Sequence, residues 1–150
     1  MFNGLRKNKR KGFTLVELII VIAIIAILAA LLLPKIGAVK ENTNKTSDIS
    51  NAREIAEAAL EASSADKIKT DYDTWVKLDG SSASSGSVKQ EVQDFMQKTP
   101  KTKSKTIPNV PSGSDFYIWL GSDGIVKVAV DDGTNKLILY PSQNIAYKSK

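Results

Sequence analysis

The stretch KGFTLVEL, residues 11–18, places one carboxylate, that of Glu17, at the start of a long apolar run. Every residue from 18 to 33 is leucine, isoleucine, valine or alanine, and counted from Phe13 the run has 21 residues. As a helix such a run is about 32 Å long, enough to cross about 30 Å of hydrocarbon. A carboxylate inside a membrane span is costly unless it is paired, so Glu17 is a candidate functional residue that needs a cationic partner.

A basic leader, residues 1–12, precedes the span and ends in Gly12. Together with Phe13, Glu17 and the Pro34 that follows the span, this leader resembles the N-terminus of type IV prepilins. The resemblance implies that a prepilin peptidase cuts between Gly12 and Phe13 and N-methylates Phe13. It also implies that Glu17 acts in filament assembly and that Pro34 bends the helix.

The resemblance is dense over residues 11–34, under a fifth of the chain, and beyond them it is one of architecture alone. One position departs from the family pattern. Ala26 stands where many members carry a glycine midway along the span. The resemblance therefore does not imply how far this helix melts when the filament assembles.

The alternatives to a prepilin leader are a secretory signal and an uncleaved membrane anchor. A secretory signal has an apolar region of about 7 to 15 residues followed by a small-x-small cleavage site, but the best such site here, Ile36-Gly37-Ala38, begins with a large aliphatic residue. An uncleaved single-pass anchor is the remaining alternative, and it gives Glu17 no role. In either case the basic leader keeps the N-terminus cytoplasmic and everything after Pro34 outside; its cations are Arg6, Lys7, Lys9, Arg10 and Lys11.

The positive charge of the chain lies in its leader. The chain has 21 Lys and Arg against 16 Asp and Glu, and the leader holds five of the cations and no acid, so the mature chain is formally neutral. The excess of positive charge therefore indicates membrane topology and processing of the leader rather than a polyanion partner. The absence of cysteine excludes a lipoprotein and a disulfide framework, which by resemblance fits a Gram-positive source.

Beyond Pro34 the helical period continues, with small or apolar residues every three or four positions and charged residues between them. We therefore predict one helix of about fifty residues. Its first half, residues 13–34, is the membrane span and filament core, and its second half, residues 35–64, lies on a globular domain. The predicted packing stripe is Ile36, Val39, Thr43, Thr46, Ile49, Ala52, Ala56, Ala59 and Leu60, and the predicted solvated face is Lys40, Glu41, Lys45, Asp48, Arg53, Glu54, Glu57 and Glu61.

Residues 65–114 are predicted to be a variable connecting region. Residues 72–78 are an irregular or strand-like segment, and residues 80–87 are a flexible polar tract. Ser87 and Gln90 form the pattern of a capping box that opens a short helix to about Lys98. The lysines that follow are interpreted as a solvated loop rather than a contact for a polyanion such as DNA, because no aromatic residue lies between them; they are Lys98, Lys101, Lys103 and Lys105.

Residues 115–150 show a hairpin pattern and a C-terminal tail. Runs of β-branched and aromatic residues at 116–120, 125–130 and 136–140 are separated by turn sequences, which predicts a three-stranded antiparallel meander. In the middle strand Val126, Val128 and Val130 alternate with Ile125, Lys127 and Ala129, so the valine face should cover the packing stripe of the long helix. In the second turn Asp131, Asp132 and Asn135 are weak calcium candidates, and an ordinary turn is the preferred interpretation.

With no His and no Cys the chain lacks an imidazole base, a thiol nucleophile and the usual transition-metal ligands. We therefore expect a structural α+β protein with the type IV pilin fold and no cofactor. By resemblance it is a pilin that polymerises into a type IV pilus for adhesion, motility or biofilm; the alternative is a pseudopilin of type II secretion or DNA uptake.

The same resemblance implies the partners. They are other copies of the chain, prepilin peptidase, the assembly platform with its ATPase, and the cytoplasmic membrane before assembly; nucleic acid is disfavoured. The location that follows is a single-pass membrane protein and then an extracellular filament.

Overall fold

The computed structural model describes residues 12–96 and 98–148, so the basic cations of the leader lie outside the described residues. The chain divides into two compact units, Met1–Ala38 and Val39–Lys150. A single helix, α1, runs from Leu15 to Ser64 and contributes residues to both.

The predicted helix of about fifty residues is confirmed, because α1 contains 50 residues and continues through Pro34. The bend expected at Pro34 stays a prediction. Within the first unit, residues 15–32 are long and apolar enough to cross a membrane, and none of their side chains is buried. Among the residues of this unit whose burial the structure describes, 12–32 and 36–38, none is buried.

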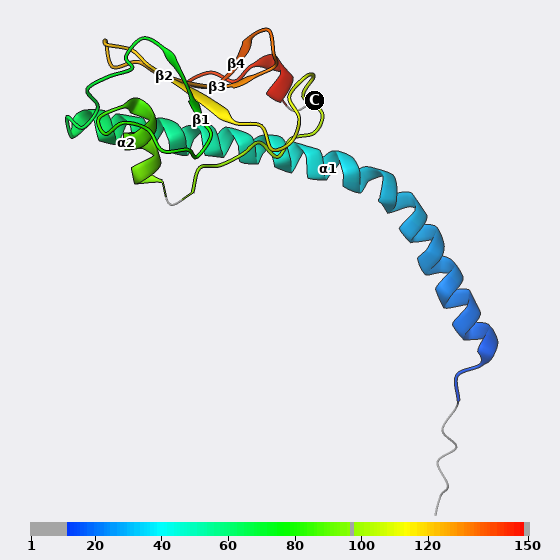
Figure 1. Cartoon of the computed structure of the whole chain (residues 1–150). Helices are drawn as coiled ribbons and strands as arrows, with labels where there is room; N and C mark the ends of the chain where they lie inside the picture. The colour runs from blue at the N-terminus through cyan, green and yellow to red at the C-terminus, as the bar shows by residue number, and fades with distance from the viewer. Residues whose placement is uncertain (1–11, 97, 149–150) are drawn as a thin grey trace, which may run out of the picture. The chain divides into compact units, whose positions relative to one another are not determined.

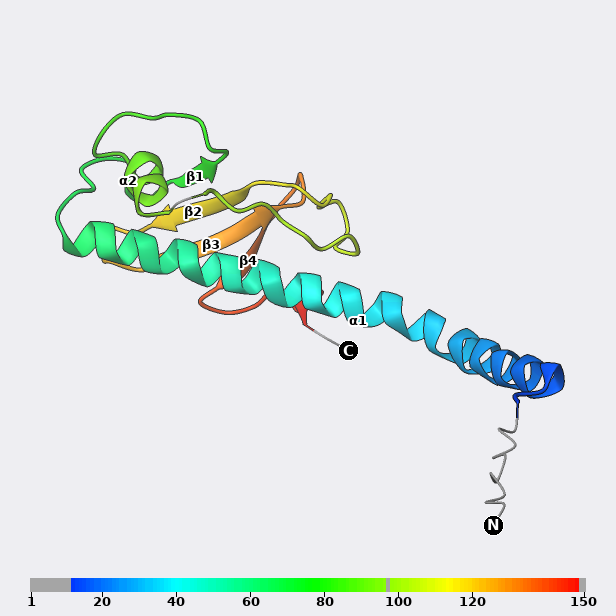
Figure 2. The same cartoon turned by 90° about the horizontal axis from the view of Figure 1, so that it is seen from below.

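The second unit contains a four-stranded antiparallel sheet in the order β1-β2-β3-β4 (Figures 1 and 2). The strands β2 (Phe116–Leu120), β3 (Val126–Asp131) and β4 (Lys136–Tyr140) form the predicted meander. The fourth strand, β1 (Trp75–Leu78), comes from the connecting region and pairs with β2. After β4 the described residues include a short 3-10 helix, η1 (Ile145–Tyr147).

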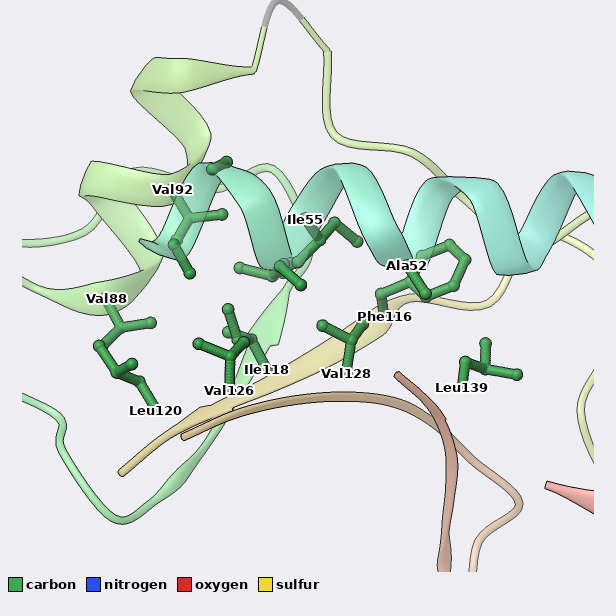
Figure 3. Close-up of a cluster of buried hydrophobic side chains, with 14 of the residues drawn as sticks. Ala52, Ile55, Val88, Val92, Phe116, Ile118, Leu120, Val126, Val128 and Leu139 are labelled. Atoms are coloured by element: carbon green, nitrogen blue, oxygen red, sulfur yellow. The ribbon is translucent and has the colours of Figure 1, made fainter. Parts of the chain in front are cut away.

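One face of the sheet packs against the part of α1 that belongs to the second unit, as Figure 3 shows for Ala52 and Ile55. Val126, Val128 and Val130 are buried, as their alternation predicts. Every buried hydrophobic side chain among the described residues belongs to the second unit. Because its core is complete, this unit has what a small domain needs to fold by itself.

The packing stripe of α1 is confirmed only near its C-terminal end. Ala52, Ala56 and Ala59 are fully buried, and Ile49 packs on the core. The prediction is wrong for five residues of the stripe, which are exposed: Ile36, Val39, Thr43, Thr46 and Leu60. Val39, Thr43 and Thr46 line an open groove on the helix. The core is instead completed by residues the pattern had not selected, namely Ile55, Ala58 and Ala62.

The solvated face is also wrong at one position, since Asp48 is 0% exposed. A periodicity argument assigns every carboxylate to water, but a buried carboxylate is tolerated where hydrogen-bond donors surround it. The connecting region supplies those donors.

The short helix α2 runs from Val88 to Phe95, ending three residues before the predicted end at Lys98. Ser87 is its N-cap and accepts a hydrogen bond from the Gln90 amide, as predicted. The reciprocal half of the capping box is absent, because the Gln90 side chain instead accepts from the Ala83 amide. Through this contact the helix start also holds the serine-rich tract.

Candidate functional site

The start of α1 is closed by a capping box that the sequence analysis did not identify. The Glu17 carboxylate accepts hydrogen bonds from the Thr14 backbone N–H at 2.8 Å and from the Thr14 hydroxyl at 2.9 Å. The Glu17 N–H donates to the Thr14 hydroxyl at 3.2 Å. The pattern Thr-x-x-Glu ahead of an apolar run was the available signal. Glu17 thus has a local role at the helix terminus, and it lies four residues from the amine that cleavage before Phe13 would create.

The proposed cleavage junction lies ahead of this helix. Gly12 and Phe13 are exposed and precede its first turn. A side chain added at Gly12 would meet no atom within 4 Å, so the fold does not require glycine there. A requirement for glycine at this position would therefore come from a processing enzyme and not from packing.

The apolar side chains of the first unit are exposed from Leu15 to Leu32. A continuous apolar helix of this length is far larger than the patch that a soluble monomer leaves open to water. Lipid or apolar surface from other chains must cover it.

In the second unit two carboxylates of α1 hold a loop of the connecting region. Asp48 accepts from the backbone N–H groups of Lys103 at 2.6 Å and Ser104 at 3.0 Å. Glu41 accepts from the next two N–H groups, those of Lys105 at 2.9 Å and Thr106 at 3.1 Å. We call Glu41, Asp48 and the four amides the carboxylate clasp. It fixes the loop along two turns of the helix.

The two carboxylates of the clasp lie near a third ionisable group, the hydroxyl of Tyr147. Although desolvation opposes it, hydrogen bonds from the loop lower the pKa of Glu41 to about 2. Burial raises the pKa of Asp48, against its two amide hydrogen bonds. The Tyr147 hydroxyl is buried, and it has no hydrogen-bond partner in the described part of the chain. Burial and the nearby charges of Asp48 and Glu41 raise the pKa of Tyr147 well above its usual value.

Replacement of Asp48 by alanine is expected to destabilise the globular unit by about 3 kcal/mol, because two amides lose a charged acceptor and one of them is buried. The measurement is chemical denaturation of the full chain in detergent, followed by tryptophan fluorescence. Glu54→Ala, which removes an exposed carboxylate from the same helix, is the matched control and should change stability by less than about 0.5 kcal/mol. Equal effects of the two substitutions would contradict the clasp.

In the lysine loop, residues 98–110, the lysine side chains are exposed but several other side chains are buried. Ile107 and Val110 are buried in the core, and Thr102 and Ser104 are buried as well. Lys101 forms an ion pair with Asp115, and the ammonium of Lys103 donates to Ser47 at 2.9 Å. The prediction of a solvated loop therefore holds for the lysine side chains, which are exposed, while other residues of the loop are packed and anchored.

In the acidic turn between β3 and β4, the carboxylates of Asp131 and Asp132 bind groups of the turn itself and Lys136. Asp131 accepts from the Gly133 amide and pairs with Lys136. Asp132 accepts from the amides of Thr134 at 2.8 Å and Asn135 at 2.6 Å. Such bonds are what Asp supplies in an ordinary turn.

The melting temperature of the protein is expected to be insensitive to a calcium chelator, because the carboxylates of this turn already serve amides and Lys136. The check is a thermal melt in chelator and in millimolar calcium. A rise of several degrees with calcium that Asp132→Ala abolishes would overturn this expectation and favour a calcium-binding pseudopilin.

Comparison with known proteins agrees with the N-terminal geometry. The family model of the prokaryotic N-terminal methylation motif matches residues 7–33. This motif is the class III signal peptide of type IV pilin-like proteins, and the long helix with its antiparallel sheet is consistent with an α+β pilin fold. The motif therefore supports a type IV pilin or pseudopilin. No curated protein and no solved structure matches the chain.

The family match points to a structural protein rather than an enzyme. The motif also implies processing by prepilin peptidase and handling by pilus assembly machinery. It suits a protein that is anchored in the membrane and then assembled into an extracellular pilus.

Proposed function

We propose that this protein is the structural subunit of a type IV pilus that serves adhesion, surface motility or biofilm formation. The observation that carries the proposal is the division of the chain into an exposed apolar helix without a core and a unit with a complete core. In a polymer the apolar helices of neighbouring subunits cover one another, while each globular unit stays folded around its own core. The globular units then coat the filament.

Processing follows from the N-terminus. The leader, residues 1–12, is removed after Gly12, and Phe13 becomes the methylated N-terminus. Residues 13–34 form the filament core, and residues 35–64 carry the globular coat. In the precursor the leader stays on the cytoplasmic side and the globular unit outside, as its cations favour, and the absence of cysteine fits a Gram-positive source.

Glu17 sets the register of assembly. Apolar helices gain little on leaving lipid for one another, so specificity comes from close packing and polar pairs. The amine of Phe13 on a neighbouring subunit, or on its own chain, is the cation that Glu17 can meet after cleavage. Two ions in an apolar core are costly singly and offset each other when paired. The pair acts as a check on register more than as net stabilisation.

The alternative, a pseudopilin of secretion or DNA uptake, shares this N-terminal mechanism. The internal use of the acidic turn supports the pilus over a calcium-bearing pseudopilin.

Electron microscopy of fibres sheared from cells tests the pilus proposal. Cells that make this protein should carry long surface fibres that antibodies to the globular unit decorate along their length. Cells lacking the protein should lose them, and its return should restore them. Fibres that persist without the protein, or labelling confined to the membrane, would contradict the proposal.

A further inference from the structure

The outer face of the sheet, turned away from α1, carries aromatic rings and lysines in cross-strand register. Trp75 pairs with Trp119, and Lys77 pairs with Tyr117. Trp119 pairs in turn with Lys127 on β3. Phe116, Ile118 and Leu120 of β2 are buried on the other face, so Tyr117 and Trp119 point outward. We call these residues, with Lys136 of β4, the aromatic-lysine face.

Two of the three lysines on this face lie over its rings. The Lys127 ammonium lies 4.0 Å from the centre of the Trp119 ring, and the Lys136 ammonium lies 3.9 Å from that of Tyr117. The Trp119 ring itself is fixed against Gly121, where a Cβ would lie only 2.7 Å from the ring atom Cη2. Cation–π contacts of this kind attract an ammonium to the face of an aromatic ring. They orient the ammonium groups without neutralising them.

The charge of the face is positive although the mature chain is formally neutral. Lys77 and Lys101 share one carboxylate, that of Asp115. Lys136 pairs with Asp131. Within the described part of the chain, Lys127 forms no ion pair. The face therefore holds more ammonium groups than carboxylates, which suits a polyanion.

We propose that the aromatic-lysine face binds an acidic polysaccharide. A sugar ring lies against the indole of Trp75, and the carboxylates of the polysaccharide pair with the ammonium groups of the face, above all that of Lys127. Trp75 is 36% exposed and lies on the edge strand, so its ring is open to a ligand. An open aromatic ring with a few placed polar groups is the usual lining of a ligand site. The lysines favour an acidic sugar over a neutral one, because their positive charge attracts carboxylates.

Single-stranded nucleic acid fits this face less well. It binds through successive bases that stack on successive open rings. Here two of the three rings, those of Tyr117 and Trp119, already have an ammonium over one side. One open ring beside fixed cations matches a chain of charged sugars better than a row of bases.

The inference rests on the proposed function only in placing the globular unit outside the cell, where polysaccharides occur. Its test uses the full mature chain in detergent micelles, so it does not depend on whether filaments form. Failure to bind would leave the pilus proposal intact, and failure to assemble would leave the binding result intact.

The probe is labelled polygalacturonate, measured by biolayer interferometry at low and moderate salt against neutral dextran of equal length. We expect binding to the charged polymer alone, weakened but not abolished by salt. Trp75→Ala should weaken binding about tenfold and Lys127→Gln about fivefold, in line with the cost of a lost ring or ammonium contact. Trp75→Phe keeps a ring and should stay within about threefold of wild type. Lys105→Gln, which removes an exposed lysine from the loop, should change little.

Three outcomes would overturn the proposal. The first is no binding of polygalacturonate by a wild-type protein that melts cooperatively. The second is equal weakening by Lys127→Gln and Lys105→Gln, which would reduce the effect to overall charge. The third is tighter binding of a single-stranded oligonucleotide than of polygalacturonate, which would assign the face to nucleic acid.

Discussion

A Gly12→Val variant is expected to accumulate as an uncleaved precursor in the membrane and to form no filaments. The structure places no demand on glycine at this position, since a side chain there would meet no atom within 4 Å. Any block must therefore arise in the active site of the peptidase, and the loss of processing should be close to complete. The measurement is the intact mass of the membrane-extracted protein.

The matched control is Gly37→Ala, at a glycine where a side chain also meets no atom within 4 Å. Alanine favours a helix more than glycine does, so this variant should be cleaved as wild type is. If Gly12→Val matures normally, the junction is not where the N-terminal motif places it.

Loss of the Glu17 charge is expected to leave insertion, cleavage and folding intact while filaments become scarce. An unpaired carboxylate in an apolar span is disfavoured, so its removal does not impair insertion. In the filament the same change leaves an amine without its partner, at a cost of about 3 to 5 kcal/mol for a buried pair that is broken. Fibre yield should then fall by about a hundredfold or more. Quantitative immunoblots of sheared fibres against the membrane pool measure it.

The capping box calls for a sharper set of variants than Glu17→Ala alone. Glu17→Gln keeps a side chain that can complete the box but removes the charge. Thr14→Ala removes the cap, at about 1 kcal/mol, and keeps the charge. Pairing between subunits predicts few fibres from Glu17→Gln and near-normal yield from Thr14→Ala. The opposite ranking would reduce Glu17 to a helix cap.

The long helix, the acidic turn and the three-stranded meander could be predicted from sequence because their signals are local. A continuous apolar run decides the helix, and the pair Asp131 and Asp132 beside a glycine predicts a turn without knowledge of what surrounds it. The three strands of the meander follow one another with short turns, so their pairing also depends on neighbours in the chain.

The features that were missed depend on residues distant in sequence. Asp48 looks solvated by periodicity, and only the amides of Lys103 and Ser104, 55 and 56 residues away, make its burial tolerable. In the same way β1 joins the sheet by pairing with β2 across the whole connecting region. The aromatic-lysine face appears only when that pairing sets Trp75 beside Trp119.

The N-terminal peptide of the subunit in sheared fibres tests the central claim, that this chain is a processed filament subunit. Mass spectrometry of the digested fibres should find a peptide that begins at Phe13 and carries one methyl group on its amine. A fibre subunit that begins at Met1, or after Ala38, would contradict the claim, as would fibres that do not contain this protein.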